Sequence, residues 1–205
     1  MASAYSEDDQ RMIRLQEGDA RAFDEIVAEW QTPLFRFFLR NTRDEQLSED
    51  LVQETLIRLY RKAWDYLPTG LFRGWLFRIA HNLLIDQSRR AKNDVLVHRI
   101  RPSMGRDGEW LDPLQNIAAE FVSPSAKASE KEIVEVIGAI LTELPEEQRQ
   151  TFLLHHFESL SLSEVADAMS TTLPTAKSRL RLAKDKLRYL LACRGLSEET
   201  SFENN

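Results

Sequence analysis

Basic and hydroxyl side chains near the end of the chain stand at spacings suited to binding DNA. From Lys177 to Arg188 the sequence has six basic residues and one acidic residue, Asp185, although the whole chain has a net charge of −6. Thr175 and Ser178 add hydroxyl groups to the same segment. On a helix, such side chains can neutralise phosphates and donate hydrogen bonds to base edges.

The residues before this segment predict the turn that presents it. Ser161 and Glu164 form an S-x-x-E capping box ahead of Val165 and Met169, which predicts a short helix. A polar break at residues 170–172 separates it from the basic helix. The pair predicts a helix-turn-helix, whose second helix fits a DNA major groove.

A second candidate segment, residues 72–90, interleaves aromatic residues with arginines beside a proline- and glycine-containing loop, Leu67–Gly70. Rings can stack on unpaired bases while arginines follow the phosphates, so the segment suits single-stranded DNA. The spacing equally suits a core stripe, formed by Trp75, Leu76, Ile79 and Leu83. Both interpretations stay open from the spacing alone.

A third candidate surface lies on the helix around residue 50. Val52, Leu56 and Leu59 share one face and should pack inward. The roughly opposite face is polar with one apolar member and consists of Asp50, Gln53, Glu54 and Ile57. It is either a solvated face or a docking surface for another helix.

The sequence gives little sign of catalysis. His155 and His156 are adjacent, so on a helix they point about 100° apart and cannot chelate one metal ion as an i, i+4 pair would. Cys193 is the single cysteine, which rules out a disulfide framework and a cysteine-rich zinc site. We expect no enzyme activity, no metal and no cofactor.

Helices must position all three surfaces. The chain has 205 residues, 42% hydrophobic and 29% charged, with few glycines and prolines and little β-branched alternation. The first block, residues 8–92, opens with an apolar stripe from Ile13 to Leu39. A third helix is predicted at about Leu47–Tyr66 and a fourth at about Phe72–Arg90.

The remaining chain divides into a linker, a second block and a tail. Residues 93–127 are rich in proline, glycine and serine without sustained periodicity, and we expect a flexible linker there. The second block covers residues 128–192, and Pro145 with two following glutamates predicts a helix start within it. Residues 193–205 are expected to fray. No apolar run is long enough to span a bilayer, so we expect a soluble cytoplasmic protein.

Six segments in this order closely resemble the extracytoplasmic-function (ECF) class of bacterial RNA polymerase sigma factors. They are Gly18–Phe23, Asp50–Thr55, Phe72–Asn82, Leu144–Arg149, Leu162–Ala166 and Lys177–Leu180. The resemblance implies an all-α fold of two small domains, sigma region 2 (8–92) and sigma region 4 (128–192). The sequence departs from the family at two places: Pro174-Thr175-Ala176 replaces a common glycine-threonine-valine, and Ser170 replaces a common turn glycine.

The resemblance also implies partners and site residues. The partners are core RNA polymerase, through its β′ clamp and β flap, promoter DNA and an anti-sigma factor. The residues implied for core binding are Asp50, Gln53, Glu54 and Ile57. Those implied for the minus-ten element are Tyr66, Leu67, Thr69, Arg73, Trp75, Arg78, Asn82, Arg89 and Arg90. Those implied for the minus-35 element are Thr175, Lys177, Ser178, Arg179 and Arg181, with Thr175 serving backbone phosphate and Arg179 packing.

Two other classes of protein compete with this interpretation. A stand-alone helix-turn-helix regulator would bind duplex DNA tightly without polymerase. A helical metal-dependent hydrolase would use Asp50, Glu54 and the histidines, and would carry a bound metal.

Overall fold

A computed structural model describes residues 5–42, 44–93, 117, 120–122 and 129–196. These residues form helices and no strand, which confirms the all-α prediction. The chain divides into two compact units: the first comprises Met1–Met104 and Ala166–Thr171, and the second Gly105–Val165 and Thr172–Asn205. None of the described helices is long and apolar enough to cross a membrane.

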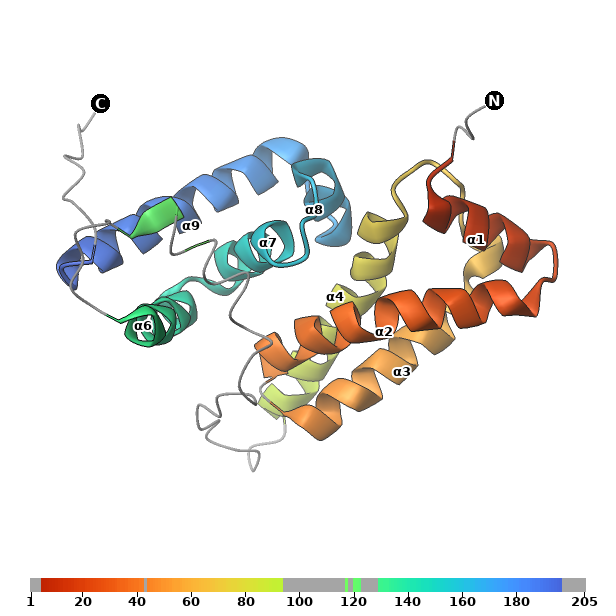
Figure 1. Cartoon of the computed structure of the whole chain (residues 1–205), viewed down its shortest axis with the longest axis horizontal. Coiled ribbons are helices and arrows are strands. Elements are labelled where there is room, and N and C mark those ends of the chain that lie inside the picture. Colours follow the sequence, from red (N-terminus) through yellow and green to blue (C-terminus); the bar gives the residue numbers. More distant parts are fainter. Residues whose placement is uncertain (1–4, 43, 94–116, 118–119, 123–128, 197–205) are drawn as a thin grey trace. The chain divides into compact units, whose positions relative to one another are not determined.

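The first unit is built around one long helix. It contains α1 (Glu7–Gln16), α2 (Ala20–Thr42), α3 (Glu45–Arg61), the 3₁₀ turn η1 (Ala63–Asp65) and α4 (Phe72–Asn93). The long helix α2 packs against α1, α3 and α4, as Figure 1 shows.

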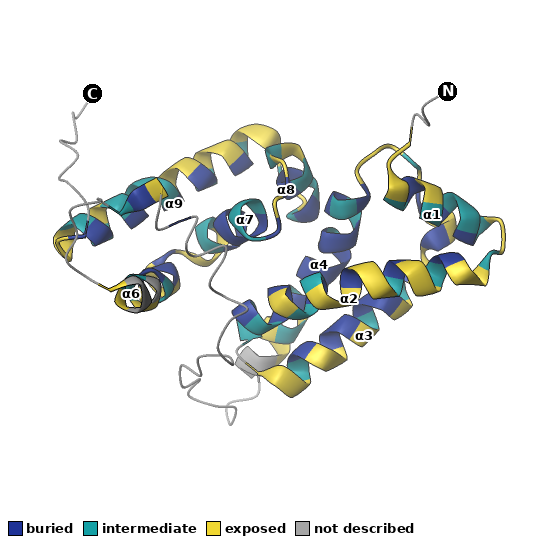
Figure 2. Ribbon diagram, viewed as in Figure 1, coloured by how far each residue is buried: buried dark blue, intermediate teal, exposed yellow. Residues whose placement is uncertain are grey.

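Aromatic and aliphatic side chains fill the space between these helices. Ile26, Leu34 and Phe37 of α2 are completely buried, as are Leu59 of α3 and Phe77 of α4. The rings of Phe37 and Phe77 meet edge to face with centroids 5.4 Å apart, a favoured aromatic geometry. In Figure 2 the buried residues of α2 form a stripe opposite exposed ones, the pattern that an amphipathic helix requires.

The third helix is shorter than the sequence predicted. It ends at Arg61, and the Lys62 N–H group contacts the carbonyls of Arg58 (3.0 Å) and Leu59 (3.2 Å). This tightening into 3₁₀ geometry is common where an α-helix ends. Tyr66, predicted as its last residue, is extended at φ −77°, ψ 132°.

The second unit contains α6 (Glu130–Glu143), α7 (Glu146–His156), the first residues of α8 (Leu162–Ala168) and α9 (Leu173–Cys193). The long helix α9 packs against α6 and α7. Pro145 is the residue before α7 rather than its first helical residue, at φ −53°, ψ 140°.

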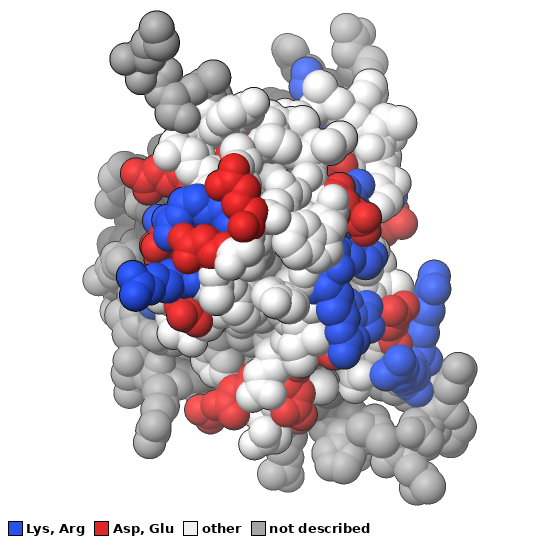
Figure 3. Space-filling model, turned by 90° about the vertical axis from the view of Figure 1, so that its right-hand side faces the viewer, with Lys and Arg blue, Asp and Glu red and all other residues white. Residues whose placement is uncertain are grey.

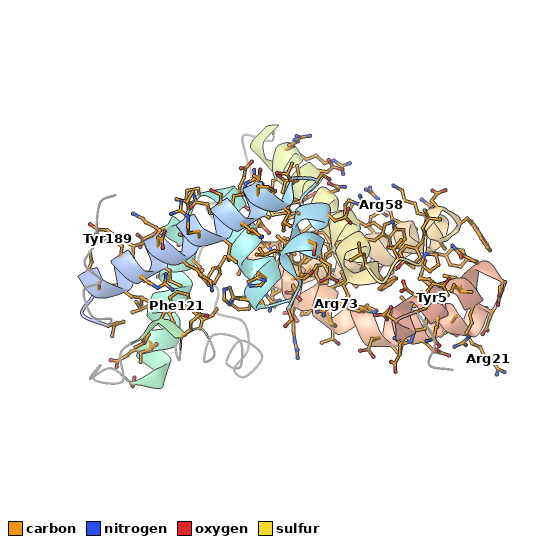
Figure 4. All side chains as sticks on the ribbon, turned by 90° about the horizontal axis from the view of Figure 1, so that it is seen from above. Tyr5, Arg21, Arg58, Arg73, Phe121 and Tyr189 are labelled. Carbon is orange, nitrogen blue, oxygen red and sulfur yellow. The ribbon has the colours of Figure 1, made fainter. Side chains whose placement is uncertain are left out.

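Two residues of the predicted linker belong to the core of this unit. Ile117 is 1% exposed and Phe121 is 5% exposed, and both pack among side chains of α6, α7 and α9; Phe121 is labelled in Figure 4. Leu196, from the predicted tail, joins the same core. Most of the predicted linker and tail lies outside the described residues, so their boundaries stay predictions.

The first helix of the helix-turn-helix has the predicted cap. Ser161 Oγ accepts the Glu164 N–H group at 3.3 Å, and Glu164 in return accepts the Ser161 N–H group at 2.8 Å, which confirms the capping box. Ser170 has a φ of 50°, so a serine takes the left-handed conformation that glycine favours. Thr172 caps α9 and Pro174 lies in its first turn, where proline needs no N–H partner.

Candidate nucleic-acid interface

The exposed face of α9 carries three of the predicted minus-35 residues. Lys177, Ser178 and Arg181 are exposed, and the Arg181 side chain is 70% exposed. Positions 177 and 181 are one helical turn apart, so their cations lie on the same face. Thr175 is half-buried, and its hydroxyl contacts that of the cap residue Thr172 at 2.8 Å.

Three other basic residues of α9 contact their own protein. Arg179 forms an ion pair with Glu147 of α7. Lys184 contacts Glu120 at 2.9 Å, and the Arg188 guanidinium lies 5.1 Å from the Phe121 ring centroid. Half of the six cations that the sequence places on this helix therefore serve packing. The role of Arg179 at the minus-35 element stays a prediction.

The two sides of α3 differ as expected. Val52, Leu56 and Leu59 are buried, which confirms the inward face. Asp50, Gln53 and Ile57 are exposed on the other side, and Ile57 keeps 43% of its surface accessible. Glu54 is half-buried and accepts a hydrogen bond from Arg58 at 2.7 Å, an i, i+4 pair. An exposed isoleucine between carboxylate and amide groups suits docking.

One stripe of α4 brings together an aromatic ring, an amide and two arginines. Trp75 and Arg78 are half-buried, and Asn82 and Arg89 are exposed. Positions 75, 82 and 89 repeat every two turns and 78 lies one turn from 75 and 82, so all four share a face. Arg90 is also exposed, about 100° from Arg89 around the helix axis.

The loop before α4 presents some of its predicted site residues and buries another. Leu67 is 73% exposed and Thr69 is exposed. Tyr66 is buried, and its hydroxyl donates to the carboxylate of Asp9. Tyr66 thus has a structural partner where we expected a DNA contact, and we leave it out of the proposed contact surface. Arg73 is half-buried with its guanidinium 5.7 Å from the Trp30 ring centroid.

Positive charge does not gather into one broad field on the face drawn in Figure 3. Lys and Arg side chains there lie next to Asp and Glu side chains, with uncharged surface between the groups. In the first unit, Arg14 lies 2.7 Å from Asp19 and 2.9 Å from Glu25. On this face the positive charge is therefore local, and the electrostatic part of DNA binding depends on the phosphates contacted locally.

Comparison with known proteins accounts for both units. The family described as Sigma-70 region 2 matches residues 26–93, and the one described as Sigma-70, region 4 matches residues 135–187. ECF RNA polymerase sigma factor SigM of Bacillus subtilis is 31% identical over 176 residues, covering 86% of this chain and 98% of SigM. The chain is an ECF sigma factor.

Another relative of this sigma factor supports the same family assignment. RNA polymerase sigma-H factor of Pseudomonas aeruginosa is 30% identical over 186 residues, covering 88% of the chain and 92% of the relative. Two solved structures share the fold. CnrH, in complex with the cytosolic domain of CnrY, has a TM-score of 0.64 at 21% identity, covering 92% of this chain and 99% of CnrH. RpoE of Bartonella quintana, in complex with the anti-sigma factor NepR, has a TM-score of 0.63 at 19% identity, covering 84% of this chain and 98% of RpoE.

The sequence did not reveal one polar residue beside the α4 site of this sigma factor. Asp9 is completely buried and accepts hydrogen bonds from the Tyr66 hydroxyl and, at 2.8 Å, from the Gly70 N–H group. Its position three residues after Ser6 signals only a capping box, which the structure also contains. The partners on the loop are 57 and 61 positions away, and no local pattern links them to Asp9.

Proposed function

We propose that this sigma factor divides promoter recognition between two surfaces and binds polymerase through a third. The chain binds core RNA polymerase and directs promoter-specific transcription initiation, as its family does. The exposed residues Asp50, Gln53 and Ile57, with the half-buried Glu54, form the proposed docking face for the β′ clamp. The second unit would also approach the β flap while α9 lies in the minus-35 major groove.

The α4 stripe and the preceding loop form the proposed minus-ten surface. Asn82 would hydrogen-bond an unstacked base, and Trp75, two turns away on the same face of α4, offers a ring for stacking. Arg78, Arg89 and Arg90 would follow the phosphates. Leu67 and Thr69 project from the loop toward solvent and would read the captured base. Arg73 lies in the first turn of α4, next to this surface, and its guanidinium lies over the Trp30 ring.

On α9, the proposed minus-35 contacts come from Lys177, Ser178 and Arg181. Thr175 would contact backbone phosphate near the helix N-terminus, where the helix dipole favours an anion. Arg179 would hold α9 against α7 and so set the angle of the recognition helix. The observation that carries this proposal is the separation of exposed from paired cations along α9.

An anti-sigma factor is a further proposed partner. RpoE of Bartonella quintana was solved with the anti-sigma factor NepR, and CnrH with the cytosolic domain of CnrY. By analogy, a regulatory protein would bind this chain and hold it away from polymerase. We place the protein in the cytoplasm, where polymerase works, and propose that it acts by binding, without a catalytic step of its own.

A gel-shift assay with and without core polymerase tests the proposed function. We expect little retardation of promoter duplex by the chain alone and a specific shift once core enzyme is added. Run-off transcription over randomised promoters would then yield the preferred minus-ten and minus-35 sequences. Tight, sequence-specific binding by the chain alone would instead support the stand-alone regulator.

A further inference from the structure

We propose that Asp9 of α1 is a positioning residue for minus-ten recognition: it fixes the backbone of the loop Leu67–Gly70 so that the loop is ready to receive a base. This inference rests on the proposed function of that loop. It extends the recognition machinery to α1, which lies before residue 26, where the match to Sigma-70 region 2 begins.

Asp9 holds both ends of the loop. One carboxylate oxygen accepts the hydroxyl of Tyr66, the residue before the loop, and the other accepts the N–H group of Gly70 at 2.8 Å. The second oxygen also accepts the N–H group of Ser6 at 3.3 Å. Burying a carboxylate is costly unless hydrogen bonds compensate it, so Asp9 depends on these donors as much as the loop depends on Asp9.

Gln16, at the other end of α1, fixes the segment just before the loop. Its side-chain amide donates to the carbonyl of Ala63 at 2.7 Å and to that of Tyr66 at 2.9 Å. The Ala63 carbonyl also accepts the Tyr66 N–H group at 3.1 Å, and the Tyr66 carbonyl lies past the end of η1, so the Gln16 amide adds to the backbone hydrogen bonds of this segment. Two residues of one helix therefore hold the chain from Ala63 to Gly70.

The helix that carries these residues is itself firmly attached. Arg14 bridges Asp19, the residue before α2, and Glu25 of α2, and hydrogen bonding to its guanidinium lowers the pKa of both carboxyls. The indole N–H group of Trp30, also on α2, donates to Asp8 at 3.0 Å. Because α1 is attached to α2, its hydrogen bonds to the loop hold the loop in a fixed position relative to the helices of the first unit.

Between the anchors, the loop exposes its side chains on a fixed backbone. Leu67 is 73% exposed, although Tyr66 beside it is buried. Gly70 has a φ of 77°, a conformation that other residues rarely adopt, and its N–H group points to Asp9. A loop already ordered loses less conformational freedom when it closes on a base, which favours capture.

Tyr66 connects this anchor to the α4 stripe. Its ring centroid lies 5.0 Å from that of Trp75 and 5.8 Å from that of Phe72. Burial and the hydrogen bond to Asp9 raise the pKa of Tyr66, so the hydroxyl remains protonated and can donate. Loss of the Asp9 contact would release Tyr66 and, with it, the alignment of the loop and the stripe.

The test compares base selectivity at the minus-ten element in run-off transcription with core polymerase. The minus-35 element is held constant and the minus-ten element is randomised. We expect Asp9→Ala and Tyr66→Phe to lower selectivity for the captured base roughly tenfold, the scale of one hydrogen bond to a charged group. Affinity for core polymerase should stay at the wild-type value. Asp9→Asn should retain most of the selectivity, because its amide oxygen still accepts from Gly70 and its amide nitrogen can donate to Tyr66.

Ser6→Ala is the matched control. It removes the other half of the α1 capping box but leaves Asp9 bonded to Tyr66 and Gly70, so base selectivity should remain at the wild-type level. The proposal is overturned if Tyr66→Phe and Asp9→Ala both keep wild-type base preference, or if Ser6→Ala loses as much. If Asp9→Ala does not fold, Tyr66→Phe decides alone, since it keeps the packed ring. A wild-type chain that shows no minus-ten preference with core polymerase would refute the proposed function itself.

Discussion

Arg179 and Arg181 are two positions apart on α9, so they point about 200° apart around the helix axis. Arg179 is ion-paired with Glu147 on another helix. Among the ion pairs of the described residues, that of Arg181 is with Asp185 of the same helix, at 3.6 Å. An exposed pair of this kind contributes little to stability, so Arg181 can exchange Asp185 for DNA at small cost.

Arg181→Ala should therefore reduce selectivity at one minus-35 position and leave protein stability nearly unchanged. A side-chain contact to a base edge contributes about 1–3 kcal/mol of discrimination. Transcription from a library of mutated minus-35 elements, with core polymerase, measures it. Arg188→Ala is the control, since its guanidinium lies 5.1 Å from the Phe121 ring centroid and its loss should keep base preference. Unchanged promoter preference in Arg181→Ala would refute the proposed contact.

His156 is a second residue whose surroundings determine a measurable property. Its ring stacks on Phe152 with centroids 4.3 Å apart, and its side chain is 15% exposed. Burial, followed by the nearby charges of Lys184 and His155, lowers the pKa of His156 to about 4 from 6.5, against a small opposing effect of Glu120. The folded state thus holds this imidazole neutral.

We expect the second unit to lose stability as the pH falls from about 6.5 to about 4. In that range the unfolded chain binds a proton at His156 that the folded chain excludes, so acidification favours unfolding by up to about 1.4 kcal/mol per pH unit. Urea unfolding followed by circular dichroism at several pH values measures the slope. His156→Leu should flatten it, whereas His155→Gln should keep most of it. An identical slope in His156→Leu would contradict the assignment.

Among the helices, α3 shows how one element can serve the core and a partner at once. Its buried residues Val52, Leu56 and Leu59 hold it in the first unit, while Asp50, Gln53 and Ile57 remain exposed. A docking surface of this kind needs little rearrangement on binding, because the helix is already fixed by its inner face.

Asp50→Arg should weaken binding to core polymerase by at least about tenfold, because it places a positive charge where the docking partner is expected to be basic. Binding of labelled core enzyme measures the affinity directly. Glu29→Arg makes the same charge change at an exposed position on α2 and should bind normally. Equal losses in both variants would point to net charge rather than to the docking face.

Local patterns predicted these helices well, whereas long-range contacts were not predictable. The Ser161–Glu164 capping box and the inward face of α3 depend on residues three to seven positions apart, and both are confirmed. The partner of Arg179 is 32 positions away and that of Gly70 is 61 positions away. Composition could not tell which cations of α9 are paired and which are exposed, because the pairing depends on which segments of the chain pack beside α9.

At the scale of the whole molecule, long-range contacts were also not predictable for the segment between the two blocks. The sequence of residues 93–127 contains apolar residues without regular spacing, so it predicted a linker, in which Leu114–Phe121 could form a short helix but no core was expected. Ile117 and Phe121 nevertheless complete the core of the second unit. Phe121 also receives Lys184 and Arg188 against its ring, at 5.7 and 5.1 Å from its centroid. A short segment upstream of α6 thus contacts two of the six basic residues of α9.

That distribution of charge, in a chain of net charge −6, sets how DNA binding without polymerase should respond to salt. Three basic residues of α9 are exposed: Lys177, Arg181 and Lys186. Each phosphate neutralised contributes about −0.9 to the slope of log affinity against log salt concentration. With three exposed cations, the slope for minus-35 duplex should be no steeper than about −3. Lys177→Ala should reduce its magnitude by about 1. Lys184→Ala should leave it unchanged, because Lys184 is already paired with Glu120 at 2.9 Å. Fluorescence anisotropy over a salt series measures both, and equal reductions would mean that Lys184 reaches the DNA after all.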